Sequence, residues 1–157
     1  TSGLALGIDA AAHRGALAAG GCTIAVLGTG PETVYPARHA GLAAEIAAIG
    51  ALVSESRRER RRCVETFRSE IAHQRTHGRL ADGRPGVLVV EAGIQSGALV
   101  TAGFARDQGR EVFAIPGSIH NALSKGCHRL IRQGAKLVES AADILEELPE
   151  LLSVQSA

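Results

Sequence analysis

The sequence predicts an α/β protein in which parallel strands alternate with helices. Its short apolar runs are continuous rather than alternating, which is typical of strands that are buried on both faces. Segments with helical spacing of apolar residues stand between these runs, as the crossovers between parallel strands require. Gly28 and Pro116 directly follow two of the runs and indicate where the chain turns.

In the first part of the chain we expect a strand at 22–27 that ends in the glycine turn Gly28-Thr29-Gly30. An Ala-rich helix is predicted at 37–49, because its apolar residues recur at helical spacing and Gly50 follows in the C-cap position. A second short strand at 51–54 follows directly.

The second part of the chain continues the same alternation. The clearest strand, 86–91, has four apolar residues in a row and ends on Glu91. After it we expect a helix at 96–108, a strand at 111–115, a helix at 122–133, a strand at 136–138 and an acidic helix at 140–148. We therefore predict a Rossmann-like, doubly wound, mainly parallel sheet over residues 1–148, followed by a tail at 149–157.

Composition excludes several classes of protein. The chain has 157 residues, of which 45% are hydrophobic and 21% charged, so it is rich enough in apolar groups to form a core and is not a disordered chain. It has no run of about 18 apolar residues, which a membrane-spanning helix would need. Its three cysteines (Cys22, Cys63 and Cys127) are far apart, which argues against a disulfide framework or a metal site and suits a cytoplasmic protein.

Ligands of such sheets bind beyond the carboxyl ends of the strands, where glycines let a phosphate approach and helix N-termini attract anions. Four loops qualify: 2–9, 28–30, 91–97 and 116–126. The turn at 28–30 lacks the last glycine of the dinucleotide fingerprint, and the chain has no P-loop, so we expect no nucleotide cofactor.

The loops at 91–97 and 116–126 contain the candidate phosphate-binding residues. Ser96 and Gly97 open a helix, with Thr101 one turn later, and they form either a phosphate cradle or a plain N-cap. A second rim of small residues with one cation follows, formed by Gly117, Ser118, Lys125 and Gly126. Glu91 is either a ligand contact or a partner of a neighbouring loop.

The residues that could perform chemistry do not form a catalytic pattern. His13 and His128 lie on predicted helices, where a structural role is expected rather than metal binding. The sequence contains no nucleophile elbow, no S-x-x-K motif and no credible Cys–His pair. We therefore expect no catalytic residue and no enzyme activity.

Several motifs in order resemble the DNA-processing protein A family (DprA, also called Smf). They are S-G-L-A-L-G-I-D-A-A-A-H at 2–13, I-A-V-L-G-T-G at 24–30, V-Y-P at 34–36, V-L-V-V-E-A at 87–92, S-G-A-L-V-T-A at 96–102, G-R-E-V-F-A-I-P-G at 109–117 and G-C-H-R-L-I-R-Q-G-A at 126–135. The resemblance implies a Rossmann-like domain that binds single-stranded DNA, forms a homodimer and loads the RecA recombinase in transformation or recombination. By position it adds Ser2 and Gly3 to the strand-binding residues named above.

The chain departs from the family pattern in two places. The family domain begins upstream with a strand and a Gly-Ser-Arg turn, so we expect this chain to be part of that domain. Residues 56–85 lack the expected F-P-x-R-N-R pattern, and the stretch from Glu55 to Gly86 holds nine Arg and five acids. GC-rich codons for this stretch, read one base off, give sequence of the family type. We therefore expect either a frameshifted translation, with low order, or a divergent basic insert; the nucleotide sequence decides between them.

Two alternatives remain from the sequence. One is an enzyme similar to the LOG-type nucleoside-monophosphate phosphoribohydrolases, although Pro116-Gly117 does not continue into the P-G-G-x-G-T loop of that family. The other is a fragment without function.

Overall fold

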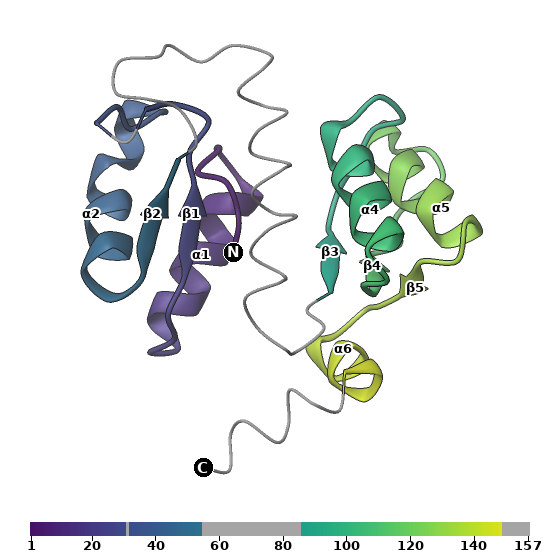
Figure 1. Cartoon of the computed structure of the whole chain (residues 1–157). Helices are drawn as coiled ribbons and strands as arrows, with labels where there is room; N and C mark the ends of the chain where they lie inside the picture. Colours follow the sequence, from purple (N-terminus) through teal and green to yellow (C-terminus); the bar gives the residue numbers. More distant parts are fainter. Residues whose placement is uncertain (31, 55–85, 149–157) are drawn as a thin grey trace. The chain divides into compact units, whose positions relative to one another are not determined.

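The computed structural model describes residues 1–30, 32–54 and 86–148 (Figure 1). It divides into two compact units, Thr1–Gln74 and Arg75–Ala157, which we describe separately as unit 1 and unit 2. The predictions for 56–85 and for the tail at 149–157 lie outside the described residues. That both units belong to one domain stays a prediction.

Unit 1 is a small parallel sheet with two helices. Its elements are α1 (Ile8–Ala18), β1 (Ile24–Val26), the 3-10 helix η1 (Ala37–His39), α2 (Ala40–Ile49) and β2 (Ala51–Val53). β1 and β2 pair in parallel, with Ile24 opposite Ala51. Ser2 forms a parallel bridge with Ala25, so the opening segment extends the sheet beyond β1.

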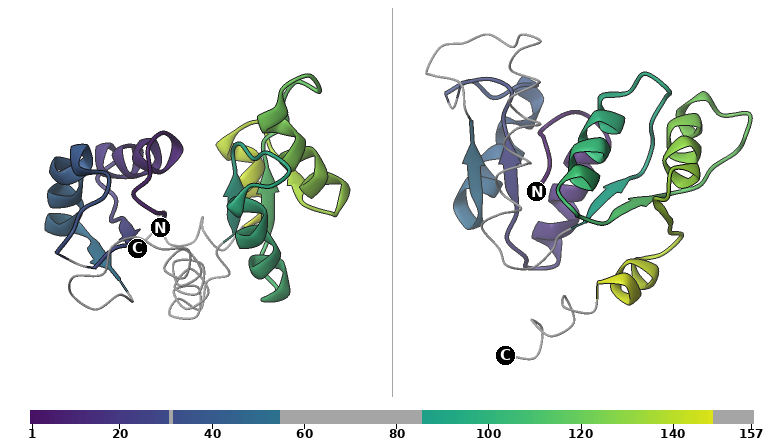
Figure 2. Two further views of the ribbon diagram at one scale, coloured as in Figure 1. Left: turned by 90° about the horizontal axis from the view of Figure 1, so that it is seen from above. Right: turned by 45° about the vertical axis from the view of Figure 1, so that its right-hand side comes forward.

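The core of unit 1 lies between the strands and the two helices. Ala25 and its neighbour across the sheet, Leu52, face the same side because paired residues of parallel strands share a face. Both helices cover that side, as the left view of Figure 2 shows. The buried cluster contains Leu4, Ala10, Ala25, Leu27, Leu42, Ala43 and Ile46.

A buried histidine ties the opening segment to this core. The His13 side chain is 1% exposed. Its Nε2 donates to the Gly3 carbonyl at 2.7 Å, and its Nδ1 lies 2.7 Å from the Thr23 hydroxyl. Both ring nitrogens therefore have partners, which confirms the structural role predicted for His13.

Unit 2 is a three-stranded parallel sheet in the order β3-β4-β5. Its elements are β3 (Val87–Val89), α4 (Gly97–Asp107), β4 (Val112–Ala114), the 3-10 helix η2 (Ala122–Ser124), α5 (Lys125–Arg132), β5 (Lys136–Leu137) and α6 (Ala141–Glu147). Val87 is opposite Val112, and Phe113 is opposite Lys136.

The central strand β4 is buried on both faces, as its continuous apolar sequence predicts. Val112 and Ala114 belong to a buried cluster that includes residues of α4 and α5. These two helices lie side by side, as Figures 1 and 2 show. Phe113 points to the opposite face and packs with Val138 and Leu148 beside α6. Helices thus cover both faces of this sheet.

The predicted Rossmann-like α/β class with parallel strands is confirmed, and every strand and helix predicted within the described ranges is present. The predicted helices at 37–49 and 122–133 each begin with a short 3-10 turn before the α-helix. No helix of the described residues is long and apolar enough to cross a membrane.

Candidate nucleic-acid interface

The two candidate loops of unit 2, 91–97 and 116–126, follow β3 and β4 and lie at the same edge of the sheet because these strands are parallel. Hydrogen bonds join them. The Ala92 N–H donates to the Leu123 carbonyl at 2.7 Å, and the Gly126 N–H donates to the Ala92 carbonyl at 2.7 Å. These bonds hold the N-termini of α4 and α5 at one edge, which we call the loop edge (residues 90–96 and 115–126).

Ser96 is the N-cap of α4. Its Oγ accepts a hydrogen bond from the Ala98 N–H at 3.3 Å, and Gly97 is the first helical residue. Thr101 lies one turn further and is half-buried. The N-cap role is compatible with phosphate binding, because the hydroxyl of Ser96 keeps a proton to donate.

Gly126 and Gly117 have a packing reason to be glycine, besides the ligand approach that the sequence suggests. A Cβ on Gly126 would lie 2.5 Å from the Ala92 carbonyl oxygen, and one on Gly117 would collide with the Ser124 side chain. His128 reinforces this contact, since its Nε2 donates to the Gly117 carbonyl at 2.9 Å. This hydrogen bond agrees with the structural role predicted for His128, which stays a prediction.

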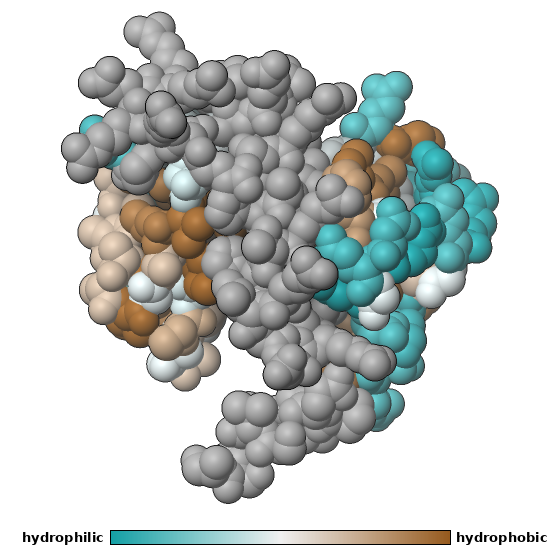
Figure 3. Space-filling view, in the orientation of Figure 1, coloured by the Kyte–Doolittle hydropathy of each residue, from teal (hydrophilic) through white to brown (hydrophobic). Residues whose placement is uncertain are grey.

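The polar side chains of the second loop are exposed, except that of Ser124. The ammonium group of Lys125, the first residue of α5, makes no hydrogen bond or ion pair with another described residue. The Ser118 Oγ accepts from the His120 N–H at 3.2 Å and so closes a turn. Figure 3 shows hydrophobic surface at the end of unit 2 that carries these loops. Two apolar side chains of the loops, Ile94 and Ile119, are 60% and 65% exposed.

Ser2 and Gly3 belong to unit 1 and surround a carboxylate. The Ser2 hydroxyl donates to Asp9 Oδ1 at 2.6 Å, and the Ala5 N–H donates to Asp9 Oδ2 at 3.1 Å. A Cβ on Gly3 would lie 2.9 Å from the same Asp9 Oδ2. The Ser2 proton is therefore engaged within unit 1. That Ser2 and Gly3 share a groove with the loop edge stays a prediction.

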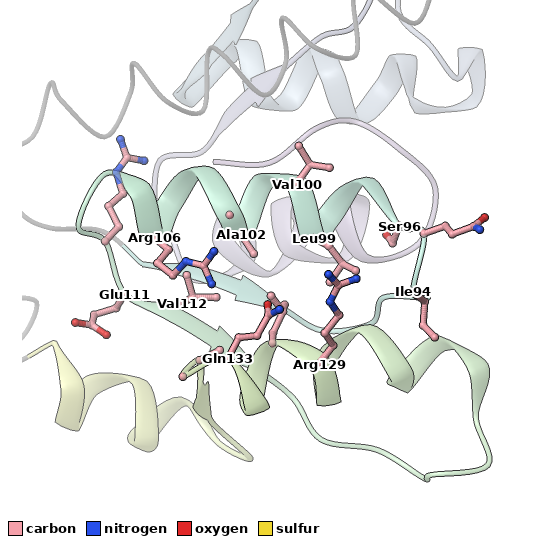
Figure 4. A pocket seen from close by; sticks show the side chains of 16 residues that line it. Ile94, Ser96, Leu99, Val100, Ala102, Arg106, Glu111, Val112, Arg129 and Gln133 are labelled. Atoms are coloured by element: carbon pink, nitrogen blue, oxygen red, sulfur yellow. The ribbon is translucent and has the colours of Figure 1, made fainter.

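Sequence reasoning missed two arginines. A cavity of about 490 Å³ lies between α4 and α5, and Arg106 and Arg129 line it together with Ser96 at one end (Figure 4). We call this cavity the α4–α5 groove. These two arginines lie on separate helices, far apart in the sequence. The local sequence pattern of each helix does not show that the two helices are neighbours, so it could not identify the arginines as a pair.

Cys127 of α5 is a buried thiol. Burial raises the pKa of the Cys127 thiol, whose Sγ lies 3.6 Å from the Val89 carbonyl oxygen, so this cysteine is an apolar core residue. Within the described ranges, no three His, Cys, Asp or Glu side chains are grouped as metal ligands. Glu91 is exposed and follows β3.

Comparisons with known proteins agree with the motif resemblance. Residues 1–149 match the family model of DNA recombination-mediator protein A. The chain is 50% identical to protein Smf of Escherichia coli over 149 residues, covering 94% of this chain and 38% of that protein. It is 46% identical to DprA of Streptococcus pneumoniae over 146 residues, covering 93% of this chain and 50% of that protein.

Two solved structures share the fold. The X-ray structure of DprA from S. pneumoniae matches with a TM-score of 0.80 at 45% identity, covering 94% of this chain and 50% of that one. A structure of DprA from Helicobacter pylori matches with a TM-score of 0.76 at 25% identity, covering 95% of this chain and 65% of that one. That structure was described for its unique single-stranded DNA binding mode. The chain spans half or less of the length of the two curated relatives named above. It belongs to the DNA recombination-mediator protein A family.

Proposed function

We propose that the protein binds single-stranded DNA and that the loop edge of unit 2 holds its phosphates. The observation that carries this proposal is the pair of hydrogen bonds at Ala92, which bring the N-termini of α4 and α5 to one edge together with Lys125. The H. pylori relative described for its single-stranded DNA binding mode supports it.

The charges at this edge favour an anion. Each helix N-terminus has a partial positive charge, because the peptide dipoles of the helix are aligned. A cation at such a position is unfavourable by roughly 0.3–1 kcal/mol, so Lys125 at the start of α5 opposes the helix dipole. A bound phosphate reverses this term, because its negative charge is attracted both by the ammonium and by the positive end of the helix dipole. We assign to the proposed phosphate site, beside Lys125, the residues Ser96, Gly97, Thr101, Gly117, Ser118 and Gly126.

The wider role follows from family membership. We propose that the intact protein processes DNA in natural transformation or recombination in the cytoplasm, assembles as a homodimer and loads RecA onto the strand. Ser2 and Gly3 belong to the proposed strand-binding residues, although the engaged Ser2 hydroxyl favours a contact through the backbone there.

Fluorescence anisotropy with labelled oligo-dT tests the binding site. We expect Lys125→Gln to weaken binding several-fold and to lower the slope of log affinity against log salt by about 0.7, because one phosphate contact is lost. Lys136→Gln is the matched control: it removes the same charge at the opposite, amino end of β5. Thermal melts of both variants show whether the fold is retained.

Equal binding by the wild type and Lys125→Gln, or an equal loss in Lys136→Gln, contradicts the proposed site. The rival enzyme function is tested on the same preparation by release of ribose 5-phosphate from AMP. Release at a catalytic rate would overturn the binding-protein interpretation.

A further inference from the structure

We propose that the α4–α5 groove is a nucleotide-binding site, in which Arg106 and Arg129 hold the phosphate and the apolar floor contacts the base. This site lies along the two helices and is additional to the phosphate contacts proposed at the loop edge. Neither arginine is among the strand-binding residues that were predicted from the sequence.

The charge of the groove is positive. Figure 4 shows the Arg106 side chain descending from α4 and the Arg129 side chain rising from α5 into the same space. Neither guanidinium makes a hydrogen bond or ion pair with another described residue. Glu111, the acid at the rim, is already paired, because its Oε2 lies 3.5 Å from the Lys136 ammonium. Two guanidinium groups on opposite walls suit a phosphate, whose oxygens accept paired hydrogen bonds from each.

The floor of the groove is apolar and the cavity has the size of a small-molecule site. Leu99, Ala102, Val112 and Leu130 line it, and Ala102, Val112 and Leu130 are part of the buried core. Its volume of about 490 Å³ lies in the range of roughly 300–1,000 Å³ that is common for ligand pockets. A bare phosphate would leave this floor in contact with water, whereas a nucleoside phosphate covers it. Gln133 at the rim offers an amide to the edge of a base.

One end of the groove reaches Ser96, at the start of α4. The occupant is therefore a nucleoside phosphate that comes either from solution or from a strand held at the loop edge. Both sources present the same chemistry to Arg106 and Arg129, and competition separates them.

The test titrates the 157-residue chain with deoxythymidine monophosphate by calorimetry. We expect this nucleotide to bind more tightly than inorganic phosphate, and Arg106→Gln and Arg129→Gln each to weaken it about tenfold, as expected for a hydrogen-bonded charge. Arg132→Gln is the matched control: it lies on the same helix α5 but lines a different cavity, so the affinity should be unchanged. All three arginines are exposed, and circular dichroism checks that the variants stay folded.

A second titration is run with saturating oligo-dT. If the oligonucleotide displaces the mononucleotide, a strand supplies the occupant; if both bind together, the occupant is a free nucleotide. The proposal is overturned if the mononucleotide does not bind, if inorganic phosphate binds equally well, or if Arg132→Gln has the same effect as Arg129→Gln. Oligo-dT binding that persists without mononucleotide binding overturns the groove alone and leaves the proposed function standing.

Discussion

At the scale of single residues, Gly126 shows how closely the two loops of unit 2 approach each other. We expect Gly126→Ala to destabilise the chain by about 1–3 kcal/mol, because the added methyl group would lie 2.5 Å from the Ala92 oxygen and must displace backbone. Urea denaturation measures the change as a lower midpoint.

Gly15→Ala provides the control for this substitution. Gly15 is exposed in the interior of α1 and has open space where a Cβ would stand. Alanine there should raise the free energy of unfolding by about 0.5–1 kcal/mol, because glycine loses more backbone entropy in a helix. Destabilisation at Gly15 similar to that at Gly126 would show that the contact with Ala92 is not the cause.

Gly126 and Ser96 could be identified from the sequence as candidate site residues, but the contacts that require a glycine and a serine at these positions could not. Glycine and a capping serine are conspicuous in a local pattern. The partner of Gly126, Ala92, belongs to another loop, and no local pattern pairs the two. Arg106 and Arg129 were missed for the same physical reason, since their proximity depends on how α4 packs beside α5.

At the scale of elements, α6 depends on a capping box. The Ser140 Oγ accepts from the Asp143 N–H, and Asp143 Oδ2 accepts from the N–H groups of Glu139 and Ser140 at 2.7 and 2.9 Å. These hydrogen bonds, the one from Glu139 first, lower the pKa of the Asp143 carboxyl below its ordinary value of 3.8. Such a box satisfies backbone donors at the start of a helix.

We therefore expect a pH-dependent contribution of Asp143 to α6. The stabilisation is complete above the ordinary pKa of 3.8 and is lost as the pH falls through the lower pKa of the folded state. A carbon-13 NMR titration of the side-chain carboxyl measures that pKa, and Asp143→Asn should remove this step from the acid transition of α6. A titration midpoint at or above 3.8 contradicts the interpretation.

The positions of elements were predictable because burial on both faces gives β4 a continuous apolar sequence, and glycine follows or closes the helices. The S-x-x-D spacing of Ser140 and Asp143 is also visible in the sequence and is typical of a helix N-terminus, in addition to the acidic composition that predicts the helix. The opening segment extends the sheet because Ser2 pairs with β1, which is distant in the sequence. This pairing could not be predicted from local sequence patterns.

At the scale of the whole molecule, charge is distributed unevenly along the sequence. The chain has 17 Lys and Arg residues against 16 acids, and nine of the arginines lie between Glu55 and Gly86. Long-range attraction of DNA depends on such charge and is screened by salt.

Family membership could be predicted from the sequence of the whole chain, because several separate motifs occur in the same order as in the family.

We expect substitution of the five arginines in 57–62 by glutamine to weaken oligo-dT binding at low salt and to reduce the salt slope. The reduction should be about 0.7 for each phosphate contact that is lost. Anisotropy titrations across a series of salt concentrations measure the slope, with Lys125→Gln beside them. An unchanged slope in the arginine variant, with a reduced slope in Lys125→Gln, would assign the phosphate contacts to the loop edge alone.

The buried ring of His13 fixes the position of a proton. The Gly3 carbonyl can only accept, so a neutral imidazole in this place must be the tautomer with hydrogen on Nε2. Nδ1 then has a lone pair directed at Thr23, and the threonine hydroxyl must supply the hydrogen. The two hydrogen bonds, from the threonine hydroxyl to Nδ1 and from Nε2 to the carbonyl, thus run in one direction. Reversing either of them would leave a buried donor or acceptor without a hydrogen-bond partner.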